Sequence, residues 1–408
     1  MNNISRILYS NLLLIPIISH WILPDSVEQK FYIDILGFPF YFFGICYFIY
    51  ILNYHRNKKD SVFKASYRNR IKLYGILFLL LSFLIGAICS VDGLLYLMID
   101  NQAIIFCAFF FLLYPLSINQ IENTKYLIIP SLIVCCAEVI LYSLGILTYS
   151  IALSDEFYGS FMRISTTIGA ATGTSYAILS IGVVSLCCYN YSNKIRYSLA
   201  ILTTVTLFLS MSRTSLVIWC FFVVVYFYKR YITHSSFSRK LIAICCLSIV
   251  CGLIGMSGVA DPIIERQSVL KSNGDINSGR GELESQALNI ARNNQYLGVG
   301  CGQLNMDKSL KELLKPSHPC GVHNIYYLIF AEEGFVGILI FFVLLFTIAR
   351  NLDYSNILSI FVLLQMLICF QYDYCWIEYE YIPIFYFIVM LCTKRFPSQK
   401  TIINIGKS

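Results

Sequence analysis

Long apolar runs separated by short polar segments make up most of the chain. A helix that spans a membrane needs about 20 mainly apolar residues, and on that criterion the sequence predicts about twelve spans. The predicted fold is therefore all-α, a polytopic transmembrane helix bundle. The predicted spans cover residues 4–23, 31–53, 73–91, 102–117, 127–150, 164–190, 197–212, 214–228, 241–260, 325–349, 355–371 and 380–393.

The order of these spans predicts three regions. Residues 1–260 hold the first nine spans, 261–322 form a long extramembrane loop with short helices, and 323–408 hold the last three spans and a tail. The N-terminal run has one early Arg and lacks a small-residue cleavage site, so we expect a retained first span rather than a cleaved signal peptide.

Composition agrees with a membrane protein, since 57% of the residues are hydrophobic and 13% are charged. A soluble chain usually carries about a quarter of its residues as charge. These values exclude a cytosolic enzyme, a nucleic-acid-binding protein and a disordered scaffold. We attribute the formal net charge of +7 to membrane topology.

Basic residues are concentrated in particular loops, which predicts the orientation of the bundle. Segment 54–72 holds seven Lys and Arg residues against one acid, so we expect it in the cytoplasm. Counting spans from there places both termini in the cytoplasm and residues 261–322 outside. This outer loop balances seven basic against seven acidic residues, and loops of such length are usually functional.

Within the outer loop the pattern predicts a short helix over 282–293 and a glycine-rich turn over 297–302. Most of the sixteen cysteines lie in apolar runs, where cysteine acts as a small hydrophobic residue. Cys301 and Cys320 lie in the loop and could form a disulfide if that side of the membrane is oxidising.

Two arginines are candidates for binding an anionic ligand at the outer face. Arg213 interrupts an almost uncharged run over 199–228, where burying a guanidinium at bilayer depth costs at least about 2.5–3.5 kcal/mol. Arg280 lies between small neighbours, and its planar fork suits phosphate oxygens. Alternatively, Arg213 marks a turn and reaches lipid headgroups, and Arg280 is solvated or pairs with Glu284.

His323 lies where the outer loop re-enters the membrane, directly before Asn324. Imidazole exchanges protons near neutral pH, which makes His323 a candidate base, although it could equally be an interfacial residue packed among tyrosines. A metal site of His318, Cys320 and His323 lacks a fourth ligand and a zinc-like spacing, so we expect no metal. Arg163, at the outer end of a predicted span, could add a third cation or act as an interfacial anchor.

Several motifs are absent from the sequence. It has no Walker A motif, no Asp-x-Asp pair, no Gly-x-Ser-x-Gly elbow and no His-Glu-x-x-His helix. ATP-driven transport, a metal-bound sugar nucleotide donor and familiar hydrolase chemistry are therefore disfavoured, and we expect no cofactor.

In its order of motifs, the chain resembles the O-antigen ligase and O-antigen polymerase superfamily of bacterial membrane proteins. The resemblance covers roughly residues 197–345. It rests on Ser212-Arg213 between two short spans, a long outer loop, Ser278-Gly279-Arg280, Gly298-Val299-Gly300, His323-Asn324 and Glu333-Gly334-x-x-Gly337. The family's tryptophan four residues after the loop arginine is Glu284 here, and Gln295 replaces the proline before the Gly-x-Gly motif.

The resemblance implies a metal-independent inverting glycosyltransferase, related in fold to the multi-span lipid-dependent class, in the bacterial inner membrane. Donor and acceptor would be undecaprenyl-diphosphate-linked oligosaccharides, and a chain-length regulator is a possible partner. Arg213 and Arg280 match the family's essential arginines and His323 its loop histidine, which implies catalytic roles. Arg163 and Asn324 are further candidates for substrate binding on the outer face.

We favour a polysaccharide polymerase that joins lipid-linked repeat units of O-antigen or capsule. One alternative is a ligase that moves the finished chain to lipid A core. A flippase for lipid-linked oligosaccharides is an alternative from another class, but it would place charges along the interior of both halves, whereas here the cations collect at the outer face. A structural or sensor protein would leave Arg213, Arg280 and His323 individually replaceable.

Overall fold

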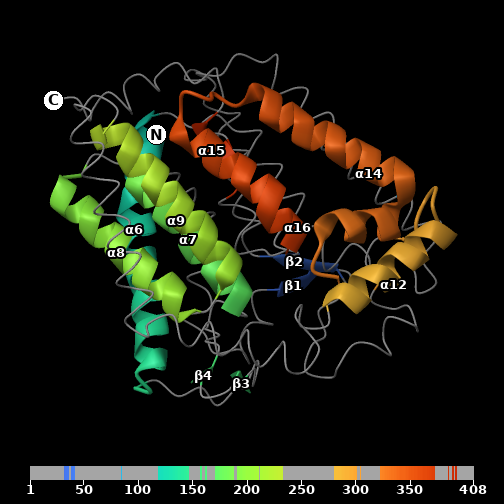
Figure 1. The fold of residues 1–408 in the computed structure, drawn as a ribbon, viewed down its shortest axis with the longest axis horizontal. Coiled ribbons are helices and arrows are strands. Elements are labelled where there is room, and N and C mark those ends of the chain that lie inside the picture. Colours follow the sequence, from blue (N-terminus) through green and yellow to red (C-terminus); the bar gives the residue numbers. More distant parts are fainter. Residues whose placement is uncertain are drawn as a thin grey trace.

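A computed structural model describes part of the chain, and this part is mainly helical (Figure 1). The described residues are 32–35, 38–41, 84, 118–146, 157–158, 161–162, 171–187, 191–210, 212–232, 280–300, 304, 322–372, 385, 388–389 and 391–392. The helices are α6 (Ile118–Ser143), α7 (Ala171–Cys187), α8 (Asn193–Leu209), α9 (Arg213–Phe227) with the π-helix η4 (Tyr228–Ile232), α12 (Arg280–Asn293), α14 (Ile325–Asn351), and α15 (Ile357–Leu364) with η6 (Gln365–Cys369) and α16 (Phe370–Tyr372).

Two short antiparallel hairpins accompany the helices. One pairs β1 (Tyr32–Ile35) with β2 (Phe38–Tyr41), and the other pairs β3 (Phe157–Tyr158) with β4 (Phe161–Met162). The first hairpin replaces the start of the helix predicted for 31–53. Its sequence contains Gly37 and Pro39, which cost a helix interior about 1 and 3 kcal/mol relative to Ala.

Only some of the predicted spans fall on described residues. Among these residues, α14 is the one helix long and apolar enough to cross a membrane by length and composition. Shorter apolar helices cover Ile128–Ser143, Gly173–Cys187 and Ile357–Tyr372. The total of twelve spans stays a prediction, because 4–23, 102–117, 241–260 and most of 73–91 and 380–393 lie outside the described residues.

Helix α6 starts and ends earlier than the predicted span 127–150. It ends because Gly145 adopts the left-handed conformation, with φ +68°, that commonly terminates helices. The Gly145 N–H then donates to the Tyr142 carbonyl at 2.9 Å, and the Ile146 N–H donates to the Leu141 carbonyl at 3.0 Å. These bonds satisfy carbonyls that a helix end would otherwise leave without partners.

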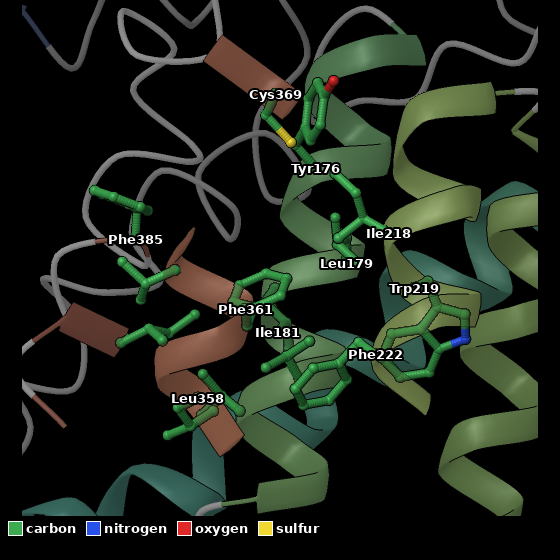
Figure 2. Close-up of a cluster of buried hydrophobic side chains, with 14 of the residues drawn as sticks. Tyr176, Leu179, Ile181, Ile218, Trp219, Phe222, Leu358, Phe361, Cys369 and Phe385 are labelled. Atoms are coloured by element: carbon green, nitrogen blue, oxygen red, sulfur yellow. The ribbon is translucent and has the colours of Figure 1, made fainter. Parts of the chain in front are cut away.

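Helices α7, α8 and α9 pack around a shared core. Helices α7 and α9 run parallel. Near their starts the hydroxyl oxygens of Ser175 and Ser215 are 3.1 Å apart, and near their ends the Tyr226 hydroxyl donates to the Leu186 carbonyl at 3.1 Å. Helix α8 is close enough that a Cβ at Gly182 of α7 would lie 2.8 Å from a methyl carbon of Thr203. The fully buried rings of this core include Tyr176, Trp219, Phe222 and Phe361 (Figure 2).

Helix α15 packs antiparallel to α9. Phe222 and Phe361 meet edge to face with their ring centroids 5.6 Å apart, and Lys229 donates to the Ser355 carbonyl at 3.3 Å. Advancing along α9 therefore means going back along α15. The start of α9 at Arg213 is consequently level with the α15–η6–α16 segment near its end.

These contacts define two ends of the helix bundle. The Arg213 end holds the N-termini of α7 and α9 and the end of α16. The Arg196 end holds the C-termini of α7 and α9 and the start of α15.

Arg196 joins three segments at its own end, where it is 4% exposed. Its guanidinium donates to the Leu186 carbonyl at 2.9 Å, the Tyr191 carbonyl at 3.1 Å and the Tyr226 hydroxyl at 2.6 Å. Leu186 belongs to the last turn of α7, where a cation also interacts favourably with the helix dipole. Arg196 thus fastens the α7–α8 connection to α9.

We expect Arg196→Met to lower the free energy of unfolding by about 2–3 kcal/mol, because hydrogen bonds from charged donors contribute about 1.5–3 kcal/mol and their buried acceptors would lose a partner. Thermal unfolding of the purified protein in detergent measures this. Lys194→Met is the control, since Lys194 is exposed in the same turn. Equal losses for both variants would contradict the role assigned to Arg196.

Candidate functional site

Arg213 occupies the first position of α9, directly after a tight connection from α8. Ser210 ends α8, and Ser212 takes an extended conformation, with φ −83° and ψ 100°, before α9 begins. The Ser212 hydroxyl donates to the Ser215 hydroxyl at 3.0 Å, which in turn contacts Ser175 of α7. The Arg213 side chain is exposed. The structure thus places Arg213 at the first residue of α9, after α8, the two helices that overlap the predicted spans 197–212 and 214–228.

His323 is placed by the cap of α14. Asn324 is 5% exposed, and its side-chain oxygen accepts hydrogen bonds from the backbone N–H groups of Tyr326 at 3.1 Å and Tyr327 at 3.2 Å. This is the usual arrangement of a helix N-cap. His323 precedes the cap and is half-buried. Asn324 thereby fixes where the helix starts and where His323 lies.

The contacts of Tyr326 bring His323 to the Arg213 end. The Tyr326 hydroxyl donates to the Met366 carbonyl at 2.5 Å, and Phe341 of α14 lies 6.4 Å from Phe370 of α16 between ring centroids. The segment 366–370 is level with the start of α9, as the α9–α15 register shows. Arg213 and His323 therefore lie at the same end of the bundle, although they are far apart in the sequence.

Helix α12 runs parallel to the first part of α14, before Gly334 (Figure 1). Their facing side chains share a small apolar core, made of Ala287, Ile290, Ala291, Leu304, Val322, Leu328 and Ala331. The C-terminus of α12 leads into a turn that contacts residues 331–336 of α14. Both helices thus advance toward this contact, so their N-termini lie on the same side of it. The backbone of Arg280, the first residue of α12, is accordingly on the His323 side; its side chain is outside the described part.

The turn after α12 crosses α14 at a break in that helix. Gly334 has φ +67° and ψ −164°, which is not helical. The break frees two carbonyls and two N–H groups of α14, and the turn provides a partner for each. The bonds run from Val299 N to Ala331 O (3.0 Å), Gly300 N to Glu332 O (2.8 Å), Phe335 N to Gln295 O (2.7 Å) and Val336 N to Tyr296 O (3.5 Å).

We name this contact the glycine crossing, formed by residues 295–300 and 331–336. It requires glycine on both sides. A Cβ on Gly298 would overlap the Glu332 carbonyl, and a Cβ on Gly334 would overlap the Tyr296 carbonyl. Both residues also have positive φ, which L side chains rarely adopt. The two backbones can approach this closely only because neither residue has a side chain.

Glu332 and Glu333 are buried at the glycine crossing, 5% and 4% exposed. The Glu333 side chain lies over Gly337, where a Cβ would come within 2.8 Å of a carboxylate oxygen. The Glu333-Gly334-x-x-Gly337 pattern thus has a packing reason, since one glycine allows the break and the other makes room for the carboxylate. The sequence alone does not predict the burial of Glu332 and Glu333, and its one indication is that they directly precede Gly334.

The remaining candidates lie outside the described residues. These are Arg163, Cys301, His318 and Cys320. Among the residues that the structure does describe, no group of three or more His, Cys, Asp or Glu side chains could hold a metal ion.

Two arginine positions and a histidine thus lie at helix N-termini at one end of the bundle. Residues 198–342, from α8 into α14, match the family model described as O-antigen ligase. This match agrees with the resemblance of residues 197–345 to the O-antigen ligase and polymerase superfamily that the order of motifs indicates. No curated protein matches the chain.

We expect Gly334→Ala to destabilise the protein more than Gly145→Ala. Both residues have positive φ, so a left-handed alanine costs each variant about 1–2 kcal/mol. Only Gly334 also meets backbone atoms, since nothing lies within 4 Å of a Cβ at Gly145. Thermal unfolding in detergent gives the difference.

Gly281→Ala completes this comparison. Gly281 lies in the first turn of α12, has open space around a Cβ and has no positive φ. The alanine variant should therefore leave the free energy of unfolding unchanged or raise it by up to about 1 kcal/mol. Equal effects of the Gly334 and Gly145 substitutions would show that close approach at the glycine crossing is unimportant.

Proposed function

We propose that the protein is a polysaccharide polymerase that joins undecaprenyl-diphosphate-linked repeat units of O-antigen or capsule. The observation that carries this proposal is that three helix N-termini lie at the Arg213 end of the bundle. Helix α9 begins with Arg213, α12 begins with Arg280, and α14 begins directly after His323 and its cap. The matched family domain contains all three positions.

The arrangement suits a diphosphate leaving group. Helix N-termini present backbone N–H groups and a partial positive charge, and guanidiniums bind phosphate oxygens through paired N–H donors. Arg213 and Arg280 would hold the diphosphate and stabilise the negative charge that grows on it as the bond from the anomeric carbon to oxygen breaks. In this mechanism the two side chains take the role that a divalent metal has in other glycosyltransferases.

His323 would act as the general base. The acceptor hydroxyl oxygen attacks the anomeric carbon from the side opposite the diphosphate, which inverts the configuration. The hydroxyl proton passes to the imidazole, and the bond to the diphosphate oxygen breaks with its electron pair. Because Asn324 caps α14, it would position His323, and any contact of its own with the sugar is an additional proposal. No cofactor is needed for this reaction.

Charge at the opposite end supports an outward-facing site. Lys194, Arg196, Lys229, Arg230 and Arg350 all belong to the Arg196 end or to segments that lead into it. Basic residues favour the cytoplasmic side, so the Arg213 end would face the periplasm or exterior, with both termini in the cytoplasm. Arg163 precedes α7, whose N-terminus is also at the Arg213 end, and is proposed as a further substrate contact. A chain-length regulator is a possible partner.

Polymerase and ligase share this chemistry and differ in the acceptor. A polymerase uses a lipid-linked repeat unit, whereas a ligase uses a different acceptor such as lipid A core. Glycan products in cells distinguish the two.

We expect Arg213→Ala, Arg280→Ala and His323→Ala to abolish the surface glycan ladder when each variant complements a deletion strain. Loss of a charge-stabilising donor should slow the reaction by about 10²–10³-fold, and loss of the base by about 10²–10⁴-fold. Gel analysis of the glycan, with membrane levels of each variant confirmed, measures this. For a polymerase, single repeat units should remain on lipid A core or on the carrier.

Two matched controls separate specific loss from loss of charge. The first control is Arg230→Ala, since Arg230 lies in η4, at the opposite end of the α9–η4 segment from Arg213. The second is Arg292→Ala, since Arg292 lies in the last turn of α12 and Arg280 in its first. Both should retain the ladder. Accumulation of full-length polymer on the undecaprenyl carrier would instead identify a ligase. An unchanged ladder in all three site variants would reject the catalytic proposal.

A further inference from the structure

The glycine crossing is bordered by exposed apolar side chains. Tyr296 and Leu297 on the turn are 74% and 40% exposed, and Phe335 and Val336 on α14 are 59% and 37% exposed. The hydrogen bonds of the crossing hold these two pairs side by side. They form one apolar patch, which we call the crossing patch. Tyr296 is the most exposed of the large apolar side chains that the structure describes.

The crossing patch continues along one face of α14. Phe335, Leu339, Phe342 and Phe346 follow one another at intervals of four and three residues, which places them on one helix face, and they are 50–67% exposed. The opposite face of α14 packs into the bundle through Phe341, Leu344, Leu345 and Ile348. A helix with this length and composition that is buried on one side presents its other side to lipid when it spans a membrane.

Helix α12 has the opposite character on its outer side. Its exposed residues are polar, namely Glu282, Ser285, Asn289 and Arg292, while Ala287, Ile290 and Ala291 face α14. Polarity therefore changes abruptly between the outer face of α12 and the turn that follows it. Tyr is a residue that commonly lies at the membrane–water interface, because its ring is apolar and its hydroxyl is polar.

We infer that the crossing patch docks on the lipid bilayer, with Tyr296 and Leu297 inserted at the level of the headgroups. The break at Gly334 would then separate two parts of α14. Residues 335–351, about 25 Å long, would cross most of the roughly 30 Å hydrocarbon core. Residues 325–333 fold back from the break, since the Tyr326 ring stacks on the Phe342 ring with centroids 5.5 Å apart. This inference rests on the membrane setting of the proposed function but is independent of the reaction.

The crossing patch is continuous with the exposed stripe of α14, so lipid would cover both. The turn contributes two apolar side chains at the point where the exposed stripe of α14 begins, so the two surfaces meet one environment. A polar outer face on α12 and an apolar stripe on α14 fit the two sides of a bilayer surface. The glycine crossing would then fix the depth of the turn after α12 relative to the membrane-crossing part of α14.

Depth-dependent fluorescence quenching tests this inference. Tyr296→Trp and Asn289→Trp are made in the full-length chain, which is reconstituted in phosphatidylcholine vesicles with or without bromine at shallow or deep acyl positions. The native tryptophans form a common background that is subtracted. The added emission of the Tyr296→Trp variant should shift to shorter wavelength and be quenched most by lipid brominated near the headgroup, and iodide should quench it weakly.

Three comparisons decide the outcome. The added emission of Asn289→Trp should respond to iodide and not to brominated lipid, because Asn289 lies on the polar face. Phe342→Trp, about two turns further along α14, should be quenched most by the deeper bromine. The inference is overturned if the Tyr296→Trp variant behaves like Asn289→Trp, as a protein partner or solvent at the patch would cause, or if brominated lipid leaves Phe342→Trp unaffected. Glycan synthesis is not measured, so a wrong reaction assignment would leave these results unchanged.

Discussion

The exchange of backbone hydrogen bonds at the glycine crossing is the constraint on which the candidate site depends. A continuous α14 would bond Phe335 to Ala331 and Val336 to Glu332 within the helix. The break at Gly334 gives up both bonds, and the turn after α12 replaces them with four bonds between segments. Unpaired backbone groups are costly in an apolar setting, so the break and the turn stabilise each other. Together they hold α12 parallel to the first part of α14.

The two ends of the bundle use positive charge differently. At the Arg196 end, the guanidinium of Arg196 is buried and donates to the C-terminus of α7 and to its neighbours, so this charge serves the fold. At the Arg213 end, an exposed arginine stands at a helix N-terminus, where a cation does not complement the helix dipole. This contrast agrees with the binding role proposed for Arg213.

Much of this arrangement was readable from the sequence, in places where a local pattern determines the local structure. A charged residue inside an apolar run marked the turn at Arg213, and helical periodicity placed α12 within two residues of its observed start. The break at Gly334 was not readable, because apolar residues continue on both sides at helical spacing. The substrate contact predicted for Asn324 stays a prediction, and the role of its side-chain oxygen as the cap of α14 was not predicted. The burial of Arg196 and the parallel pairing of α12 with α14 depend on contacts between distant segments, which periodicity does not report.

Because α9, α12 and α14 all start at one end of the bundle, this end is assembled in the order in which the three helices are synthesised. Arg213 leaves the ribosome long before His323, and the helix that begins at Arg280 has no partner until the segment around Gly334 has been made. Until then its apolar side, with Ala287 and Ile290, has nothing to pack against from α14. The site can therefore be complete only after most of the chain has been inserted. A nascent protein that stalls before α14 would carry Arg213 and Arg280 without the segment that completes the proposed site.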